Sequence, residues 1–293
     1  MSAVEPLPFA LVMVSAVSHP LWNLLAKGAD DKESFMVLLN LAALALFIPV
    51  FLVVLPDWSL PLEVVPILTV SAAAETVYYL ALGRAYEGGD MSVVYPVARS
   101  SPVFVTVAAA LLLGETITPW GLTGILVIFV GVYTLHLRGL GSAELLQPVR
   151  RLGEPASRYA LAAALGTTVY SIADKMGVTA VAPLRYAFWM VVFNTGFLTA
   201  VTLLRRGPRG VAAEAHRRPL RAAAAGFLMT GGYMLVLVAM SMTQVSYTLA
   251  LRQASVVLGA LLGVTILGER HRWIRVASSA VIFTGVYILG VLA

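Results

Sequence analysis

The sequence predicts an all-α membrane protein with ten transmembrane helices, arranged as two inverted five-helix repeats. Three observations support this fold class. First, 59% of the 293 residues are hydrophobic and only 12% are charged, a balance that a soluble fold of this size could not bury. Second, the chain divides into ten apolar segments of spanning length. Third, its two halves repeat each other.

Each of the ten apolar segments is bounded by proline, glycine or charged residues. A helix needs about 20 residues to cross the hydrocarbon core, and every segment is of about that length. The longest polar stretch, 139–156, is interpreted as a linker between a first repeat (1–138) and a second repeat (157–293). The predicted spans are 7–26, 34–55, 62–84, 91–113, 118–138, 157–180, 184–204, 220–242, 246–268 and 272–292.

A shift of 154 residues superimposes one half on the other. Leu113-Gly114-Glu115 then matches Leu267-Gly268-Glu269, and Gly131-Val132-Tyr133 matches Gly285-Val286-Tyr287. Chance matching in apolar sequence is the alternative, but the shared Gly-Glu and the ordered Gly-Val-Tyr disfavour it. Since five is odd, the second copy enters the membrane from the opposite side, as in many transporter folds.

The basic residues predict the orientation of the chain in the cell (inner) membrane. Of 20 Lys and Arg residues, 16 fall in the loops after spans 1, 3, 5, 7 and 9, and only Arg185 falls on the other side. The positive-inside rule therefore places the loop 205–221 in the cytoplasm and both termini outside. This distribution explains the net charge of +5 without a nucleic-acid partner.

The composition also excludes several kinds of chemistry. Without cysteine there is no thiol catalysis, iron–sulfur cluster, cysteine zinc site or disulfide. There is no Walker lysine motif for ATP hydrolysis, and the histidines lack metal-ligand spacing. We therefore expect no cofactor, no metal and no enzymatic activity.

Ionisable residues inside the spans are the candidate site, because a charge at mid-helix costs about 2.5–3.5 kcal/mol. Counting about 1.5 Å per residue from the span starts, we expect Glu75, Arg99 and His19 to share one depth near the midplane. We interpret them as a substrate and coupling site. The alternative is a buried Glu75–Arg99 pair that only fixes helix packing.

A second arginine, Arg252, lies one residue from the position equivalent to Arg99. A guanidinium donates two hydrogen bonds at once to a carboxylate or phosphate. We therefore expect Arg99 and Arg252 to bind an anionic group, Glu75 to act as counter-ion or proton carrier, and His19 to relay protons. Nearer the outer face, Asp174 and Lys175 predict a snorkelling or paired motif at a helix end.

Aromatic and amide side chains on the same spans predict a pocket of mixed polarity. Pro20, Pro96 and Pro102 are expected to interrupt the spans 7–26 and 91–113 and to free backbone groups beside a cavity. Glu115 and Glu269, at span ends, are expected to fasten helix ends or loops. Besides the arginines, the predicted substrate-binding residues are Trp22, Asn23, Tyr78, Tyr79, Tyr95, Tyr233, Tyr247 and Gln253, with Asn40, Trp189 and Asn194 on the same set of spans.

Several segments resemble the EamA family of the drug/metabolite transporter superfamily. They are His19-Pro20-Leu21-Trp22-Asn23-Leu24-Leu25-Ala26-Lys27, Gly83-Arg84-Ala85-Tyr86 and Tyr95-Pro96-Val97-Ala98-Arg99, together with the repeated Leu-Gly-Glu and Gly-Val-Tyr. The resemblance covers nearly the whole chain and implies a ten-helix bundle around a central cavity, with alternating access without ATP. Related phosphate-handling translocators use cations in helices 4 and 9, where Arg99 and Arg252 stand. Many members keep both termini in the cytoplasm, whereas the loop charges here place them outside.

The predicted function is secondary active transport of a small anionic or zwitterionic metabolite by alternating access, coupled to protons. Two alternatives stay open, an exporter of lipophilic cations or drugs with Glu75 as the cation site, and a lipid flippase or receptor. The expected partners are a small-molecule substrate and the lipid bilayer, and the protein is expected to be a monomer or a homodimer.

Overall fold

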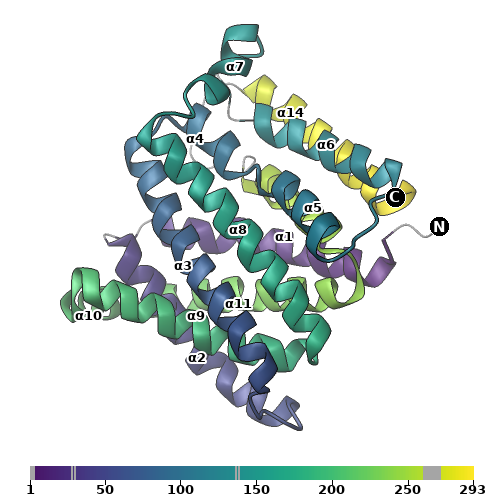
Figure 1. Ribbon diagram of the computed structural model, residues 1–293. Coiled ribbons are helices and arrows are strands. Elements are labelled where there is room, and N and C mark those ends of the chain that lie inside the picture. Colours follow the sequence, from purple (N-terminus) through teal and green to yellow (C-terminus); the bar gives the residue numbers. More distant parts are fainter. Residues whose placement is uncertain (1–3, 28, 30, 136, 138, 260–271) are drawn as a thin grey trace.

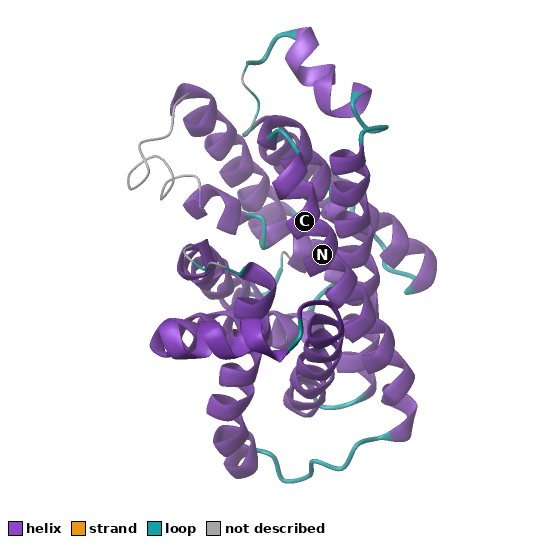
Figure 2. Ribbon diagram, turned by 90° about the vertical axis from the view of Figure 1, so that its left-hand side faces the viewer, coloured by secondary structure: helices purple, strands orange, loops and turns teal. Residues whose placement is uncertain are grey.

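The computed structural model describes residues 4–27, 29, 31–135, 137, 139–259 and 272–293, and this part of the chain is made of helices joined by loops (Figures 1 and 2). A short 3-10 helix, η1 (Leu62–Val64), precedes α3, and a π-helical segment, η2 (Ile288–Leu292), continues α14. The α-helices are α1 (Pro6–Lys27), α2 (Lys32–Val54), α3 (Val65–Gly88), α4 (Met91–Ala98), α5 (Ser101–Leu112), α6 (Pro119–Thr134), α7 (Ser142–Arg150), α8 (Pro155–Ala180), α9 (Pro183–Arg206), α10 (Pro208–Arg217), α11 (Pro219–Met242), α12 (Val245–Leu251) and α14 (Arg272–Tyr287).

Within the described residues, 7 helical segments are long and apolar enough to cross a membrane. Helix α6 is apolar but shorter, and α8 is long enough but carries Arg158, Asp174 and Lys175. The predicted span 246–268 lies partly outside the described residues. The total of ten spans therefore stays a prediction. The 7 segments are Pro6–Ala26, Lys32–Val54, Leu62–Gly88, Met91–Leu112, Pro183–Arg206, Pro219–Met242 and Trp273–Leu292.

The helices pack in reciprocal pairs that follow the sequence repeat. Under the 154-residue shift α1 corresponds to α8 and α3 to α11, and the structure packs α1 against α11 and α3 against α8. The equivalent helices α2 and α9 pack on each other, as do α6 and α14. Contacts that are exchanged in this way are those that a twofold axis generates, so the packing fits an inverted repeat.

The seam between α6 and α14, which lie side by side in Figure 1, brings backbone onto backbone. A Cβ atom on Gly131 would lie 2.9 Å from the backbone nitrogen of Ile282, and one on Gly285 would lie 2.8 Å from that of Ile128. Both positions of the second contact are 154 residues from those of the first. The same close contact is thus made twice, and only small residues permit it.

Both helices that carry a predicted arginine ligand are broken at that arginine. Helix α4 ends at Ala98 and α5 begins at Ser101, with Arg99 as the C-cap between them. Pro102 explains this break, because it has no N–H to donate to the carbonyl of Ala98.

The equivalent helix α12 has Arg252 as its C-cap, and helix resumes at residue 254. No proline stands in this second break. Instead the chain tightens through bonds between residues three apart, from Ser255 N to Arg252 O (3.1 Å) and from Gln253 N to Ala250 O (3.0 Å). The expected interruptions at Pro20 and Pro96 were wrong, since α1 and α4 run unbroken through those residues.

Two polar stretches contain helices where loops were expected. The linker 139–156 holds α7, which has Glu144 in its first turn and Arg150 in its last, a charge order that suits the helix dipole. Tyr133 donates a hydrogen bond to the carbonyl of Leu145 (2.6 Å) and ties α7 to α6. The loop 205–221 holds α10, which begins at Pro208, a residue preorganised for a first turn.

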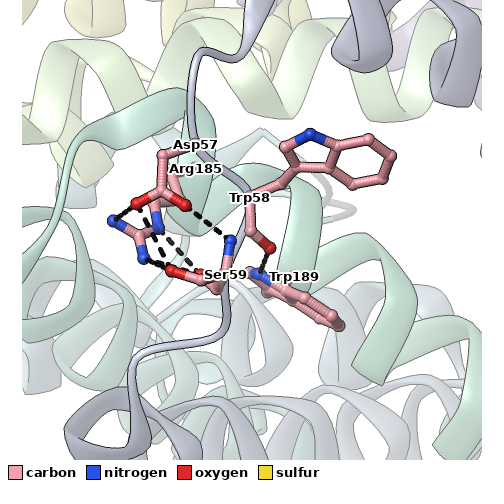
Figure 3. A network of polar contacts seen from close by, with 5 residues as sticks. All are labelled: Asp57, Trp58, Ser59, Arg185 and Trp189. Atoms are coloured by element: carbon pink, nitrogen blue, oxygen red, sulfur yellow. Dashed lines mark hydrogen bonds and ion pairs between the residues drawn. The ribbon is translucent and has the colours of Figure 1, made fainter.

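Polar contacts attach the loop after α2 to the first two turns of α9 (Figure 3). Arg185 forms an ion pair with Asp57 (2.8 Å) and donates to the carbonyl of Ser59 (2.7 Å), and Trp189 donates to the carbonyl of Trp58 (3.2 Å). The Ser59 backbone N–H, then its hydroxyl, and the Arg185 charge hold the pKa of Asp57 below its ordinary value.

The opposite end of α9 is also attached to α2. Arg205 and Arg206 pair with Glu33 in the first turn of α2, at 3.1 and 3.4 Å. Helices α2 and α9 are therefore joined at both ends.

Glu115 fastens a helix end, as predicted. Its carboxylate accepts from the backbone N–H of Val245 (2.7 Å) and from the hydroxyl of Ser246 (2.5 Å), at the start of α12. This cap replaces one from Gln244, whose side chain makes no capping bond. Glu269 lies outside the described residues.

Candidate functional site

A cavity lies between the two halves of the molecule and contains about 940 Å³ of space free of atoms, including the part open to solvent. Helices α1 to α5 line it from the first half, and α8, α9, α11 and α12 from the second. Its ionisable and amide side chains are His19, Asn40, Glu75, Arg99, Asn194, Arg252 and Gln253, and its aromatic side chains are Trp22, Tyr78, Tyr79, Tyr170 and Tyr233.

All but three of the predicted site residues line this cavity. Asn23 is exposed and donates to the backbone carbonyl of His19 (2.8 Å). Tyr247 accepts a hydrogen bond from the backbone N–H of Thr118 (3.2 Å), at the start of α6. Tyr95 lies behind Arg99, whose guanidinium carbon is 5.5 Å from the centre of the ring. These three residues are not among the residues that line the cavity.

Glu75 is held by an amide and a phenol. Tyr79, one turn further along α3, donates to Glu75 Oε1 (3.1 Å), and Asn194 on α9 donates to Glu75 Oε2. In the described part of the chain Glu75 makes no ion pair with Arg99, so the alternative of a structural Glu75–Arg99 pair is not realised. Among the described residues the hydrogen-bond partners of this carboxylate are neutral, which leaves it able to take up a proton or to face a positively charged ligand group.

His19 and Arg99 meet at the break between α4 and α5. Arg99 Nη2 lies 3.5 Å from His19 Nε2, and the imidazole packs edge-on against Trp22 at 5.4 Å between ring centres. A guanidinium only donates, so Nε2 accepts and the proton of a neutral imidazole sits on Nδ1. That nitrogen is buried without a protein partner. His19 thus carries a buried donor beside the cation of Arg99.

Three tyrosines from three helices form one wall of the cavity. The ring centres of Tyr78 and Tyr170 are 6.0 Å apart, and those of Tyr170 and Tyr233 are 6.3 Å apart. The guanidinium carbon of Arg252 lies 5.0 Å from the centre of the Tyr233 ring, within cation–π range. Arg252 is therefore held at the edge of an aromatic surface.

The expectation for Asp174 and Lys175 needs correction. Asp174 is 1% exposed and accepts from the hydroxyls of Ser71 (2.6 Å), Tyr186 (2.7 Å) and Tyr233, while Lys175 donates to the backbone carbonyl of Met240 (2.5 Å). The two side chains do not pair with each other, since Asp174 binds hydroxyls and Lys175 binds carbonyls at the end of α11. Sequence reasoning missed this cluster because its donors come from three other helices.

Two comparisons bear on the chain as a whole. The model of the EamA-like transporter family matches residues 7–137 and 156–291, in two stretches that correspond to the two halves. A solved structure described only as "Crystal structure of protein" is 20% identical and superposes with a TM-score of 0.72, over 97% of this chain and 99% of that one. That likeness concerns the fold alone. No curated protein matches the chain.

Proposed function

Since the chain belongs to the EamA-like transporter family, we propose that it is a secondary active transporter of a small anionic or zwitterionic metabolite, working by alternating access. The observation that carries the proposal is the content of the cavity. Arg99 and Arg252, each at a helix break in its own half, line one space together with Glu75. Guanidinium groups on both sides suit a carboxylate or phosphate that is passed between the two halves.

Buried acceptors in the cavity favour a substrate that also carries hydrogen-bond donors. The side-chain oxygens of Asn194 and Gln253 are buried without a protein partner, and both residues line the cavity. Leaving such acceptors unpaired costs about 1–3 kcal/mol each, so a ligand that supplies N–H or O–H groups gains from filling them. An amino acid or a hydroxylated acid satisfies both the arginines and these oxygens.

The helix breaks supply further polar groups for an anion. Ser101, which opens α5, and Ser255, which follows the break after α12, both line the cavity. The start of a helix carries partial positive charge, and discontinuous helices at mid-membrane are typical of secondary transporters. The breaks thus support the assignment of the anion site to this depth.

In this scheme Glu75 carries the coupling proton and His19 relays it. Glu75 lines the cavity and, among the described residues, is bonded to the neutral side chains of Tyr79 and Asn194, and His19 is the neighbour of Arg99. Substrate binding at the arginines then changes the electrostatic field at both groups.

Flux measurements in proteoliposomes test the proposal. A thermal-shift screen with carboxylates, phosphates, amino acids and lipophilic cations first selects a compound that stabilises the protein. We expect Arg99→Ala to reduce its uptake at least tenfold, because a charged hydrogen bond of about 1.5–3 kcal/mol is lost.

Glu75→Gln is expected to abolish uptake driven by a pH gradient and to spare exchange of substrate. Arg185→Lys, outside the cavity, serves as the control. Unchanged transport in both cavity variants would overturn the assignment.

An exporter of lipophilic cations is the second candidate, and the tyrosine wall beside Glu75 is the observation that favours it. The guanidinium of Arg252 already lies over the face of the Tyr233 ring where a cationic substrate would bind, which weighs against this function. The same screen decides between the two, because cations would then stabilise the protein and anions would not.

For the setting of the transporter we propose the inner membrane, with both termini outside and the protein acting as a monomer or a homodimer. The distribution of 16 of 20 basic residues on one side supports this orientation. A reporter that is active only outside the cytoplasm is expected to be active when fused to either terminus. Inactive fusions would indicate the opposite orientation.

A further inference from the structure

The buried carboxylate of Asp174 has no role in the transport scheme so far. It lies on α8 and is 1% exposed, and it is not among the residues that line the cavity. Hydroxyl donors reach it from Ser71 on α3, Tyr186 on α9 and Tyr233 on α11. A charge buried so deeply persists only when such charge-assisted bonds satisfy it, so the cluster is built around this one group.

Tyr233 connects this carboxylate to the cavity. Its hydroxyl donates to Asp174 Oδ2, and its ring lies under the guanidinium of Arg252 at 5.0 Å. A hydroxyl bound at one end leaves the ring little freedom, since only two side-chain torsions orient it. The bond to a carboxylate also polarises the phenol and increases the negative charge that the ring presents to a cation.

The sequence repeat contains a second copy of this tyrosine. Tyr79 precedes Tyr233 by 154 residues, and its hydroxyl also donates to a carboxylate, that of Glu75. The two copies differ in access, because Glu75 lines the cavity and Asp174 does not. One tyrosine therefore serves a carboxylate that faces the transport path, and the other serves a carboxylate sealed behind it.

We propose that Asp174 is a positioning residue for Arg252 and acts through Tyr233. Asp174 fixes the Tyr233 ring, and the ring fixes the guanidinium that faces the cavity. The inference rests on the proposed function for the role of Arg252 as an anion ligand, but the placement of Arg252 can be measured without any substrate.

A matched pair of variants separates positioning from simple stability. Tyr233→Phe and Tyr186→Phe each remove one hydroxyl donor from the same carboxylate and keep the aromatic ring. Of these two rings, that of Tyr233 is the one that packs against the guanidinium of Arg252. Both variants are expected to lower the melting temperature by similar amounts, because each removes one charge-assisted bond.

The readout is the rate at which phenylglyoxal, an arginine-directed reagent, modifies Arg252 in the full-length protein in detergent, followed by mass spectrometry relative to Arg99. We expect Tyr233→Phe and Asp174→Asn to raise this ratio about threefold. The ring stays in both variants but is no longer fixed by its hydroxyl, and threefold is the factor expected when the guanidinium leaves a modest cation–π contact with it. Tyr186→Phe is expected to leave it unchanged.

Equal ratios in Tyr233→Phe and Tyr186→Phe, whether raised or not, would overturn the proposal. If Asp174→Asn fails to fold, the pair of phenylalanine variants still decides. Absence of transport by the wild-type protein would contradict the proposed function and leave this measurement valid.

Discussion

The carboxylates of Glu75 and Asp174 differ in what their hydrogen bonds leave open. Asp174 accepts from three hydroxyls and is sealed from the cavity, so its charge is fixed in place. Glu75 has one phenol and one amide as donors and borders the cavity. A group that must exchange protons or touch a substrate needs the second environment, and a group that orients neighbours needs the first.

Asp57 provides a pH-dependent test at the α2–α9 connection. Hydrogen bonds from Ser59, with the charge of Arg185, hold its pKa below the ordinary value of 3.8. A lowered folded-state pKa means that the contact stabilises the fold above the unfolded pKa and ceases to do so as the pH falls through the folded value. We expect Asp57→Asn to melt at a lower temperature than wild type at pH 6 and at the same temperature in strong acid. A difference that persists in acid, measured by thermal unfolding in detergent, would contradict this.

For single residues, the sequence predicted which side chains lie at the cavity better than it predicted their hydrogen-bond partners. A fixed rise per residue was enough to group Glu75, Arg99 and His19, which all line the cavity. The bond from Tyr79 to Glu75 stays within one helix turn, whereas the bond from Asn194 comes from another helix. For the same reason the donors of Asp174 were not predictable, since spacing along one chain segment does not say which helices converge.

Helix breaks place both arginines at the cavity. Proline chemistry predicted the break before Pro102 and wrongly predicted breaks at Pro20 and Pro96. A proline within a packed helix removes one backbone hydrogen bond, and the helix can continue past it. The break at Arg252 has no proline signal, so only the structure reveals it. Helices α7 and α10 were also missed, since short amphipathic helices look like polar loops in a search for apolar spans.

Substitution of Pro102 tests whether the first break is required. Pro102→Ala restores an N–H that can bond to Ala98 O, so we expect α4 and α5 to join and Arg99 to leave its place beside His19. Transport of the stabilising compound is expected to fall about tenfold or more, with the melting temperature kept or raised.

Pro49 offers the matched control. It lies inside α2 and does not line the cavity, so Pro49→Ala is expected to stabilise the protein, by up to about 3 kcal/mol, and to leave transport unchanged. Normal transport by Pro102→Ala would show that the break is dispensable.

On the scale of the molecule, the reciprocal packing of α1 on α11 and α3 on α8 makes the two halves one structure. The 154-residue shift predicted this relation between halves, because matched segments occupy matched places. The repeat alone could not predict which helix faces of the two halves contact each other, since that depends on side chains from both halves at once. The total of ten spans also stays a prediction, because α6 is short, α8 carries charged residues, and 246–268 lies partly outside the described residues.

The glycine seam between α6 and α14 gives a symmetric stability prediction. A methyl group on Gly131 or Gly285 would collide with backbone atoms, at 2.9 and 2.8 Å, so Gly131→Ala and Gly285→Ala are each expected to cost about 1–3 kcal/mol. Gly83 in α3 has no atom within 4 Å of such a methyl, and Gly83→Ala is expected to stabilise the helix by about 1 kcal/mol. Thermal melting of the three variants checks this, and a large difference between the two seam variants would argue against the symmetry.

A seam in which backbones touch also limits how the molecule can move. Sliding of one helix past another normally proceeds by changes of side-chain rotamers, whereas at Gly131 and Gly285 the backbone of the neighbouring helix lies directly against the glycine. We therefore expect α6 and α14 to travel as a single stiff strut. Spin labels at the two ends of this strut would keep their separation through the transport cycle, and the strut would supply the fixed frame against which movements of the other helices can be measured.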